Sequence, residues 1–332
     1  MDRNKFIQAS TRIRVFEKNL LTKSQINRLL DSESLQTALT SLNDSSYSAD
    51  IKNLQRDEDF EKILSQGLLN SFDEIKKISP DKNLLRFLEE EYNFHNLKVM
   101  LKEILQDKNY SSIYVDIGEA DILAIKKAIK NDEKLSDNPY YSYALKAYNL
   151  YKESKNPQVI DLYLDKCYYD KLLKDAKDLD DESLLNFTKE KIDLINLKSL
   201  IRVKSQQNSL DSLQKALIAG GTIEKENFEK AYAMEKSTYP SLLTRSKAYK
   251  YAKKAFEADD LRIISQNLEK AIDNHMMDFA KNAKKITFGP EVILGFLISK
   301  QMEIKNLRII LVGKLNSLSR EFIEKRLRET YV

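Results

Sequence analysis

Apolar side chains recur every three or four residues along most of this chain. Residues 84–102 read LLRFLEEEYNFHNLKVMLK, and their apolar positions fall on one face of a helix with 3.6 residues per turn. Two further stretches have the same pattern: LLNFTKEKIDLINLKSLIR at residues 184–202 and LGFLISKQMEIKNLRIILV at residues 294–312. The periodicity therefore predicts three long amphipathic helices.

These three stretches are copies of one sequence. All contain the motif Asn-Leu-(Lys/Arg)-x-apolar-apolar. The aligned positions are Asn96, Asn196 and Asn306, then Leu97, Leu197 and Leu307, then Lys98, Lys198 and Arg308. Because asparagine is a poor helix former, its return at the same register predicts a structural role. We expect each amide to bridge two helices beside a buried leucine, with the basic side chain facing solvent or a neighbouring repeat.

A second apolar series with helical spacing precedes each copy. Its positions are Phe60, Leu64, Leu68 and Phe72; Ile160, Leu164, Tyr168 and Leu172; and Leu268, Ile272, Met276 and Ala280. Each repeat is therefore predicted to hold a helical hairpin preceded by shorter helices. The polar runs DKNYSS and QQNSLDS interrupt the period, which divides the chain into helical repeats 1–110, 111–210 and 211–332. This period is much longer than that of open helical arrays, so we expect three like units around an axis.

Composition supports an all-α fold and narrows the range of functions. The chain of 332 residues has only 7 glycines and 5 prolines, too few for the turns of a doubly wound α/β sheet. Its 55 basic and 51 acidic residues nearly cancel, leaving a net charge of +4. A dedicated nucleic-acid binder would concentrate positive charge, so protein partners are favoured over nucleic acid.

The predicted location is the cytoplasm. A single cysteine, Cys167, excludes an intrachain disulfide and a cysteine-based zinc site, and it fits a reducing compartment. The N-terminal segment carries charge every few residues and has no apolar core of signal-peptide length. The longest apolar runs, such as VILGFLI at 292–298, are far shorter than the roughly 20 residues that span a bilayer. Membrane association is expected only through another protein.

No motif predicts a catalytic, cofactor-binding or metal-binding residue. The Gly313-Lys314 pair lacks the remaining glycine and the hydroxyl residue of a phosphate-binding loop, and Gly220-Gly221-Thr222 is typical of a helix stop and turn. His95 and His275 have no nearby ligand set, which favours packing or surface roles. The acidic run at 178–182 precedes a predicted helix, where carboxylates stabilise the helix N-terminus.

Two sets of lysines are the candidates for partner contact. Lys247, Lys250 and Lys254 form the first set, and Lys281, Lys284 and Lys285 form the second. Their spacing can place each set on one helix face. Such a strip is more often a solvated surface, and its functional interpretation is docking to acidic groups of a partner.

Four regions of the sequence resemble the C subunit of archaeal and bacterial V-type ATPases, a family related to the eukaryotic d subunit. They are residues 12–47, residues 92–102 (YNFHNLKVMLK), residues 289–314 and the ending EKRLRETYV. The resemblance spans essentially the whole chain. It implies a non-catalytic central-stalk adaptor, shaped as a funnel of three similar helical domains around a pseudo-threefold axis.

The same resemblance implies the partners. These would be the central shaft subunits, lettered D and F, and the membrane rotor ring, with one copy of this chain per complex. Such an adaptor would couple the shaft of the soluble ATPase head to the ring, for ion transport or ATP synthesis. The periodicity and the balanced charge also permit an alternative, a helical scaffold unrelated to rotary ATPases.

Overall fold

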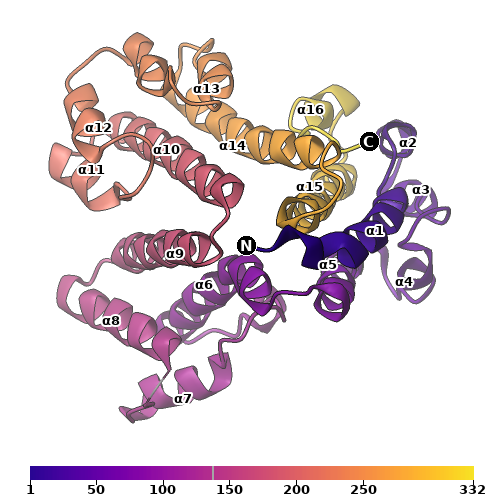
Figure 1. Cartoon of the computed structure of the whole chain (residues 1–332), viewed down its shortest axis with the longest axis horizontal. Helices are drawn as coiled ribbons and strands as arrows, with labels where there is room; N and C mark the ends of the chain where they lie inside the picture. Colours follow the sequence, from indigo (N-terminus) through magenta and orange to yellow (C-terminus); the bar gives the residue numbers. More distant parts are fainter. Residues whose placement is uncertain (137) are drawn as a thin grey trace. The chain divides into compact units, whose positions relative to one another are not determined.

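The computed structural model describes residues 1–136 and 138–332, and all regular structure in them is helical (Figure 1). The six longest helices are α5 (Phe60–Ile78), α6 (Lys82–Gln106), α9 (Gln158–Asp178), α10 (Glu182–Ser205), α14 (Leu261–Ala283) and α15 (Pro290–Leu315). They coincide with the six long helices predicted from the apolar period, so the all-α prediction is confirmed. Among the described helices, none combines the length and apolar character that a bilayer crossing requires.

The chain forms two compact units. The first contains Met1–Asp81, Lys250–Ala258 and Ile263–Val332, and the second contains Lys82–Tyr249 and Asp259–Arg262. The predicted division into residues 1–110, 111–210 and 211–332 follows the sequence repeat rather than these units, and it stays a prediction.

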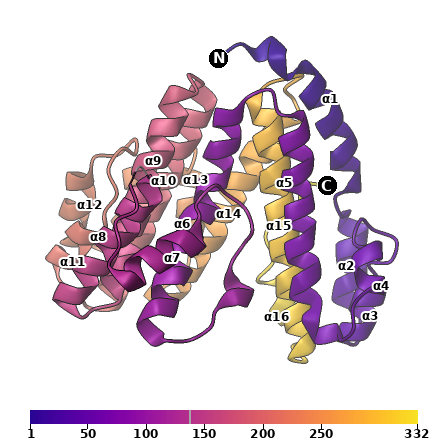
Figure 2. The ribbon, with the colours of Figure 1, turned by 90° about the horizontal axis from the view of Figure 1, so that it is seen from below.

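In the first unit, α15 lies antiparallel to both α5 and α14 (Figure 2). Arg308 near the end of α15 pairs with Glu61 at the start of α5, with Nε and Oε1 2.8 Å apart. A Cβ on Gly295, near the start of α15, would lie 2.8 Å from that of Ala283 at the end of α14. This close approach confirms the predicted hairpin of α14 and α15.

Short helices complete the first unit. They are α1 (Ile7–Phe16), α2 (Lys23–Asp31), α3 (Leu35–Thr40), α4 (Ser48–Lys52), α13 (Tyr249–Ala255) and α16 (Arg320–Glu324). Helix α2 begins with a capping box in which Thr22 and Gln25 satisfy each other's backbone N–H groups. Leu29, Ala38 and Leu42 from this N-terminal part share an apolar core with Leu307 and Leu311 of α15. The beginning of the chain therefore covers its last long helix.

In the second unit, α9 packs against α6 and α10. Lys102 of α6 pairs with Asp161 at 3.0 Å, and Glu90, earlier on α6, pairs with Lys171 at 3.0 Å. These pairs make α6 antiparallel to α9, and the hairpin of α9 and α10 makes α10 run in the same direction as α6. The remaining helices of this unit are α7 (Ile122–Asn131), α8 (Pro139–Ser154), α11 (Leu210–Ala216) and α12 (Lys225–Tyr232).

Local signals explain where these helices begin and end. Asp181 accepts from the backbone N–H groups of Ser183 and Leu184 and so caps α10, which confirms the capping role predicted for the acidic run. Each long helix that carries the asparagine motif ends at a residue in the left-handed region. These residues are Asp107, Gln207 and Ser317, with φ of 48°, 54° and 53°. Each lies eleven positions after its asparagine, so the helix terminus repeats together with the motif.

Candidate functional site

Each repeated asparagine binds a non-helical segment that follows its own helix. The Nδ2 of Asn96 donates to the carbonyl of Val115 at 2.7 Å, and its Oδ1 accepts from the N–H of Val115 at 3.0 Å. The same two bonds join Asn196 to Ile218 at 2.8 and 2.8 Å, and Asn306 to Arg328 at 3.1 and 2.8 Å. We call this paired contact the asparagine clamp.

The clamp corrects the predicted partner of these amides. We expected each amide to bridge two helices, whereas all three hold extended backbone beyond the end of a helix. A carboxamide presents an N–H donor and a carbonyl acceptor side by side, so it pairs with a peptide unit as one rung of a β-ladder does. Asparagine is thus used for a geometry that neither leucine nor aspartate reproduces. The neighbouring Leu97, Leu197 and Leu307 are each 0% exposed, as the apolar pattern predicted.

Two of the three basic residues after the clamps make ion pairs across helices. Lys98 of α6 pairs with Asp165 of α9, and Arg308 of α15 pairs with Glu61 of α5. Each pair joins two antiparallel helices within one unit, although Asp165 lies one turn beyond Asp161, the position that corresponds to Glu61. Arg308 is exposed while it makes its ion pair, and Lys98 is partly buried.

A second anchor lies three residues before two of the clamps. Oδ1 of Asn93 accepts from the N–H groups of Glu119 and Ala120 at 3.0 and 3.1 Å. Asp193 accepts from the N–H of Thr222 through Oδ2 at 3.1 Å and from the N–H of Ile223 through Oδ1 at 3.2 Å, so both of its oxygens are used. Burial raises the pKa of Asp193 to about 6, against the hydrogen bonds that favour its charged form.

Glycine is required beside both anchors. A Cβ on Gly118 would lie 2.1 Å from Oδ1 of Asn93, and one on Gly221 would lie 2.1 Å from Oδ1 of Asp193. Gly220 adopts a φ of +87° after the end of α11, in keeping with the predicted helix stop and turn. The Gly-Gly-Thr sequence therefore serves the anchor.

The third copy has Glu303 at the anchor position, with a different set of donors. Glu303 accepts from the N–H of Leu21, from the hydroxyl of Tyr47 at 2.7 Å and from Nζ of Lys300 at 2.7 Å. The Lys300 ammonium lies 4.4 Å from the centre of the Tyr47 ring. Burial and the Glu303 carboxylate raise the pKa of Tyr47 well above its usual value.

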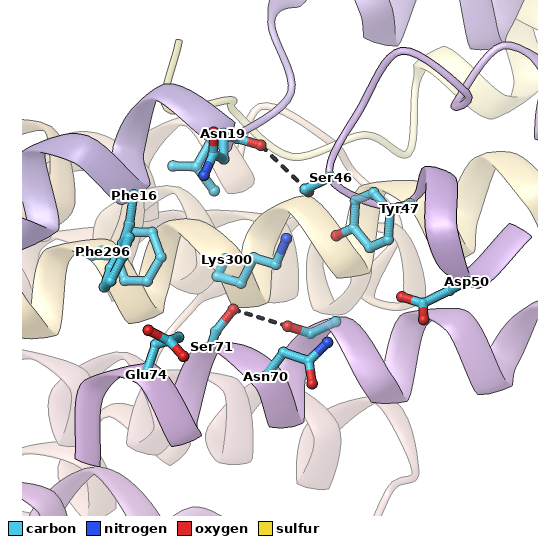
Figure 3. Close-up of a pocket in the computed structure, with 12 residues that line it drawn as sticks. Phe16, Asn19, Ser46, Tyr47, Asp50, Asn70, Ser71, Glu74, Phe296 and Lys300 are labelled. Atoms are coloured by element: carbon cyan, nitrogen blue, oxygen red, sulfur yellow. Dashed lines mark hydrogen bonds between the residues drawn. The ribbon is translucent and has the colours of Figure 1, made fainter. Parts of the chain in front are cut away.

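This buried group forms one wall of a pocket of about 140 Å³ (Figure 3). The Lys300 side chain runs along the pocket between Phe296 and Tyr47, and Asn70, Ser71 and Glu74 of α5 line the facing side. Because Lys300 and Glu303 satisfy each other, the arrangement is that of a structural ion pair.

The lysine and the two histidines that were weighed as candidate functional residues also make contacts within the chain. Lys314 donates from Nζ to the carbonyl of Leu30 at 2.7 Å, at the end of α2, and Gly313 lies inside α15. His95 contacts the carbonyl of Ile113 at 3.0 Å, and His275 is buried with its ring centre 5.8 Å from that of Tyr251. Within residues 1–136 and 138–332, no group of three or more metal-ligating side chains could hold a metal ion.

The two predicted lysine strips do not lie on single helix faces. Helix α13 begins at Tyr249, so Lys247 lies in the preceding turn and only Lys250 and Lys254 are on the helix. Helix α14 ends at Ala283, so Lys284 and Lys285 follow it. The lysines have helical spacing in the sequence, but each set includes residues that lie beyond a helix end.

Three of these lysines hold other parts of the chain. Lys250 pairs with Asp278 of α14, with Nζ and Oδ2 2.5 Å apart. Lys281 pairs with Glu329 at 2.8 Å, and Nζ of Lys284 donates to the carbonyl of Tyr331 at 2.6 Å. Lys281 and Lys284 therefore fix the C-terminal tail. Lys247, Lys254 and Lys285 have exposed side chains.

The sequence model of the ATP synthase (C/AC39) subunit family matches residues 9–326, a range that includes all three repeated asparagines. The chain belongs to this family. The C/AC39 match covers the anchors, the pocket of Figure 3 and the first two clamps, and it ends two residues before Arg328, the backbone partner of Asn306.

Individual C/AC39 relatives align over almost the whole chain. The C subunit of the V-type sodium ATPase of Enterococcus hirae is 26% identical over 96% of this chain and 97% of its own length. The C subunit of the A-type ATP synthase of Methanocaldococcus jannaschii is 24% identical over 97% of this chain and 86% of its own length. That of Thermococcus kodakarensis is 26% identical over 90% of this chain and 84% of its own.

Proposed function

We propose that this chain is the non-catalytic central-stalk adaptor of a prokaryotic V-type ATPase. It would couple the rotating shaft of the soluble ATPase head to the membrane rotor ring, for ion transport or ATP synthesis. The observation that carries the proposal is the C/AC39 family match over residues 9–326. Its partners would be the D and F subunits of the shaft and the ring. One copy would act per complex, on the cytoplasmic side and peripheral to the membrane.

We further propose that three helical repeats surround a pseudo-threefold axis and form a funnel. Support comes from the local repetition: α6, α10 and α15 share the asparagine clamp, the fully buried leucine and the left-handed terminus. Three copies of one device in one chain suit a part that meets symmetric partners along a rotation axis.

The mechanism that we infer is transmission of torque. A rotor part must resist twisting, and close-packed helices are poorly compressible. The clamps tie non-helical backbone to the long helices with satisfied buried hydrogen bonds, which rigidify a fold. A non-catalytic role agrees with the structural use of Lys300, Lys314 and Asp181, each of which is bonded within the chain.

The six candidate lysines remain proposed partner contacts, and they differ in whether they already make bonds within the chain. Lys247, Lys254 and Lys285 are exposed and could meet acidic groups of the shaft or ring directly. Lys250, Lys281 and Lys284 would have to exchange their bonds to Asp278, Glu329 and Tyr331 for a partner. We therefore place the contact on the first three.

Coexpression with the D and F subunits from the same source tests the function. We expect size-exclusion chromatography and native mass spectrometry to give a complex with one copy of this chain. The double variant Lys254→Glu/Lys285→Glu should weaken that complex. The matched control, Lys5→Glu/Lys52→Glu, changes the same charge at exposed positions of the same unit and should not. Absence of a complex with the unaltered chain would reject the adaptor.

A further inference from the structure

The first copy of the repeat is shorter than the others between the helix end and the clamp. The chain runs eleven residues from Gln207 to Ile218 and eleven from Ser317 to Arg328, but only eight from Asp107 to Val115. Three residues make up about one turn of helix. The first copy therefore lacks one helical turn.

In the other two copies, that turn covers the flank of the long helix. Helix α11 packs against α10 and α12, where its Leu213 is 0% exposed. Helix α16 packs against α15, where its Ile323 is 1% exposed and touches Gly313. Each of these aliphatic residues lies five positions before the clamped residue. The turn thus places one large apolar side chain on the long helix.

The first copy has a hollow at the corresponding place. A single 3-10 turn, Ser111–Ile113, replaces the short helix, and Ile113 is 47% exposed. A hollow of about 670 Å³ is bounded by α6, the segment 109–121 and the start of α7. We call it the first-repeat hollow. Its lining includes Glu103, Tyr114, Asp116, Asp121, Leu123 and Lys126.

Helix α7 is the counterpart of α12, so the hollow lies where α11 lies in the second copy. Both helices begin shortly after the anchored segment. Ile125 of α7 and Phe228 of α12 are each 0% exposed, and three residues later Ala128 and Ala231 are also buried. This register pairs Leu123 with Glu226. Leu123 is 80% exposed at the rim of the hollow, where the second copy has a charged residue.

The lining of the hollow is acidic. Asp116 and Asp121 are exposed on the segment before α7. Glu103 pairs with Lys126 at 2.7 Å and accepts from the hydroxyl of Tyr114 at 2.6 Å, and these contacts lower the pKa of Glu103 to about 2. One lysine against three carboxylates leaves net negative charge around an apolar rim. Such a surface fits a segment that is both aliphatic and basic.

We propose that the first-repeat hollow docks one turn of amphipathic helix from a partner subunit. Its large aliphatic side chain would take the place that Leu213 and Ile323 take in the other copies, and a lysine or arginine would face Asp116 and Asp121. Recognition of a helix by a groove in this way is a recurring mode of peptide binding. This inference rests on the proposed function for the partner, which would belong to the same rotary complex.

The substitution Leu123→Glu tests the hollow. Glutamate is the residue that the second copy has at this position, as Glu226, and the position is exposed. The isolated variant should therefore have the melting temperature of the unaltered chain. In the proposed complex the partner would bury Leu123. Its replacement should therefore weaken assembly with the remaining stalk and ring by about tenfold or more. The control is Val15→Glu, which also replaces an exposed aliphatic residue by glutamate, at a site on α1 that is 55% exposed. Equal affinity of Leu123→Glu and the unaltered chain would overturn the inference.

A cross-link identifies the occupant. With a photoreactive phenylalanine at position 123 of the assembled complex, we expect a bond to a partner peptide that has aliphatic and basic residues at helical spacing. A bond to a second copy of this chain, or none, would overturn the inference. The proposed function fails separately, because it requires the unaltered chain to enter the complex at all.

Discussion

At the scale of single residues, Asp193 and Asn93 do the same work with different chemistry. Both accept two backbone N–H groups of the segment before the next helix, and both touch a required glycine. Asn93 is neutral, whereas Asp193 must be charged and buried at neutral pH. Its raised pKa records that cost, because burial outweighs three hydrogen bonds to the carboxylate.

Replacing Asp193 with asparagine should therefore remove this pH dependence of stability, although the new Nδ2 donor would face one of the two backbone N–H donors. The folded-state pKa of about 6 lies above the ordinary value of 3.8, so the folded state binds this proton more tightly. Stability from this group is gained as pH falls through about 6 toward 4 and is lost as pH rises. The rise in pKa corresponds to a loss of about 3 kcal/mol in the free energy of unfolding at pH 8, relative to acidic pH.

Thermal unfolding from pH 4 to pH 8 measures this effect as the difference between the two proteins. The unaltered chain should lose stability relative to Asp193→Asn as the pH rises from 4 to 8, so the difference in melting temperature should shift in favour of the variant. A difference that does not change with pH would contradict the assignment to Asp193, because other titrating groups are common to both proteins.

At the scale of the elements, the apolar period located all six long helices, because each buries one or more continuous faces. The asparagine partners could not be found in this way. Val115, Ile218 and Arg328 share no side-chain property, since they are bound through their backbones. The one sequence signal for these segments was the pair of glycines, Gly118 and Gly221, that lie beside the anchors.

The expectation that each lysine set lies on one helix face was wrong for a related reason. Spacing of three, four and seven describes a helix face only within one helix, and both sets run past a helix end. Their partners, Glu329 and Tyr331, belong to the tail and are distant in sequence from Lys281 and Lys284. Local periodicity contains no information on such tertiary pairs.

The clamp itself makes a prediction about stability. Asn196→Ala leaves the buried N–H and carbonyl of Ile218 without partners, and each such group costs about 1–3 kcal/mol. We expect urea unfolding to give a loss of about 2–4 kcal/mol in the free energy of unfolding. The control is Asn149→Ala on the exposed side of α8, which should change it little or slightly increase it. Equal behaviour of the two variants would show that the clamp contributes nothing.

At the scale of the whole molecule, the beginning of the chain completes its last copy of the repeat. Helix α6 packs on α9, the next long helix, and Lys98 pairs with Asp165 across them. Helix α15 has no later long helix, and it packs instead on α5, where Arg308 pairs with Glu61. The hydroxyl of Tyr331 also donates to Glu17, which joins the tail to the N-terminal part. The ends of the chain are thereby bound into the fold.

In the proposed function, an adaptor of three repeats would meet a ring of many identical hairpins, and its contacts there could not all be equivalent. Electrostatic attraction tolerates such mismatch better than close apolar packing, because it is less directional and acts over longer distances. Retention of this chain on the ring should therefore fall as salt rises from about 0.1 M to about 1 M, over which the screening length drops from about 10 Å to about 3 Å. The measurement is the amount of chain that co-sediments with the ring across the salt series, with the melting temperature of the isolated chain followed in the same buffers. Loss of binding without loss of folding is the expected result, and retention that is indifferent to salt would mean that apolar contacts dominate this interface.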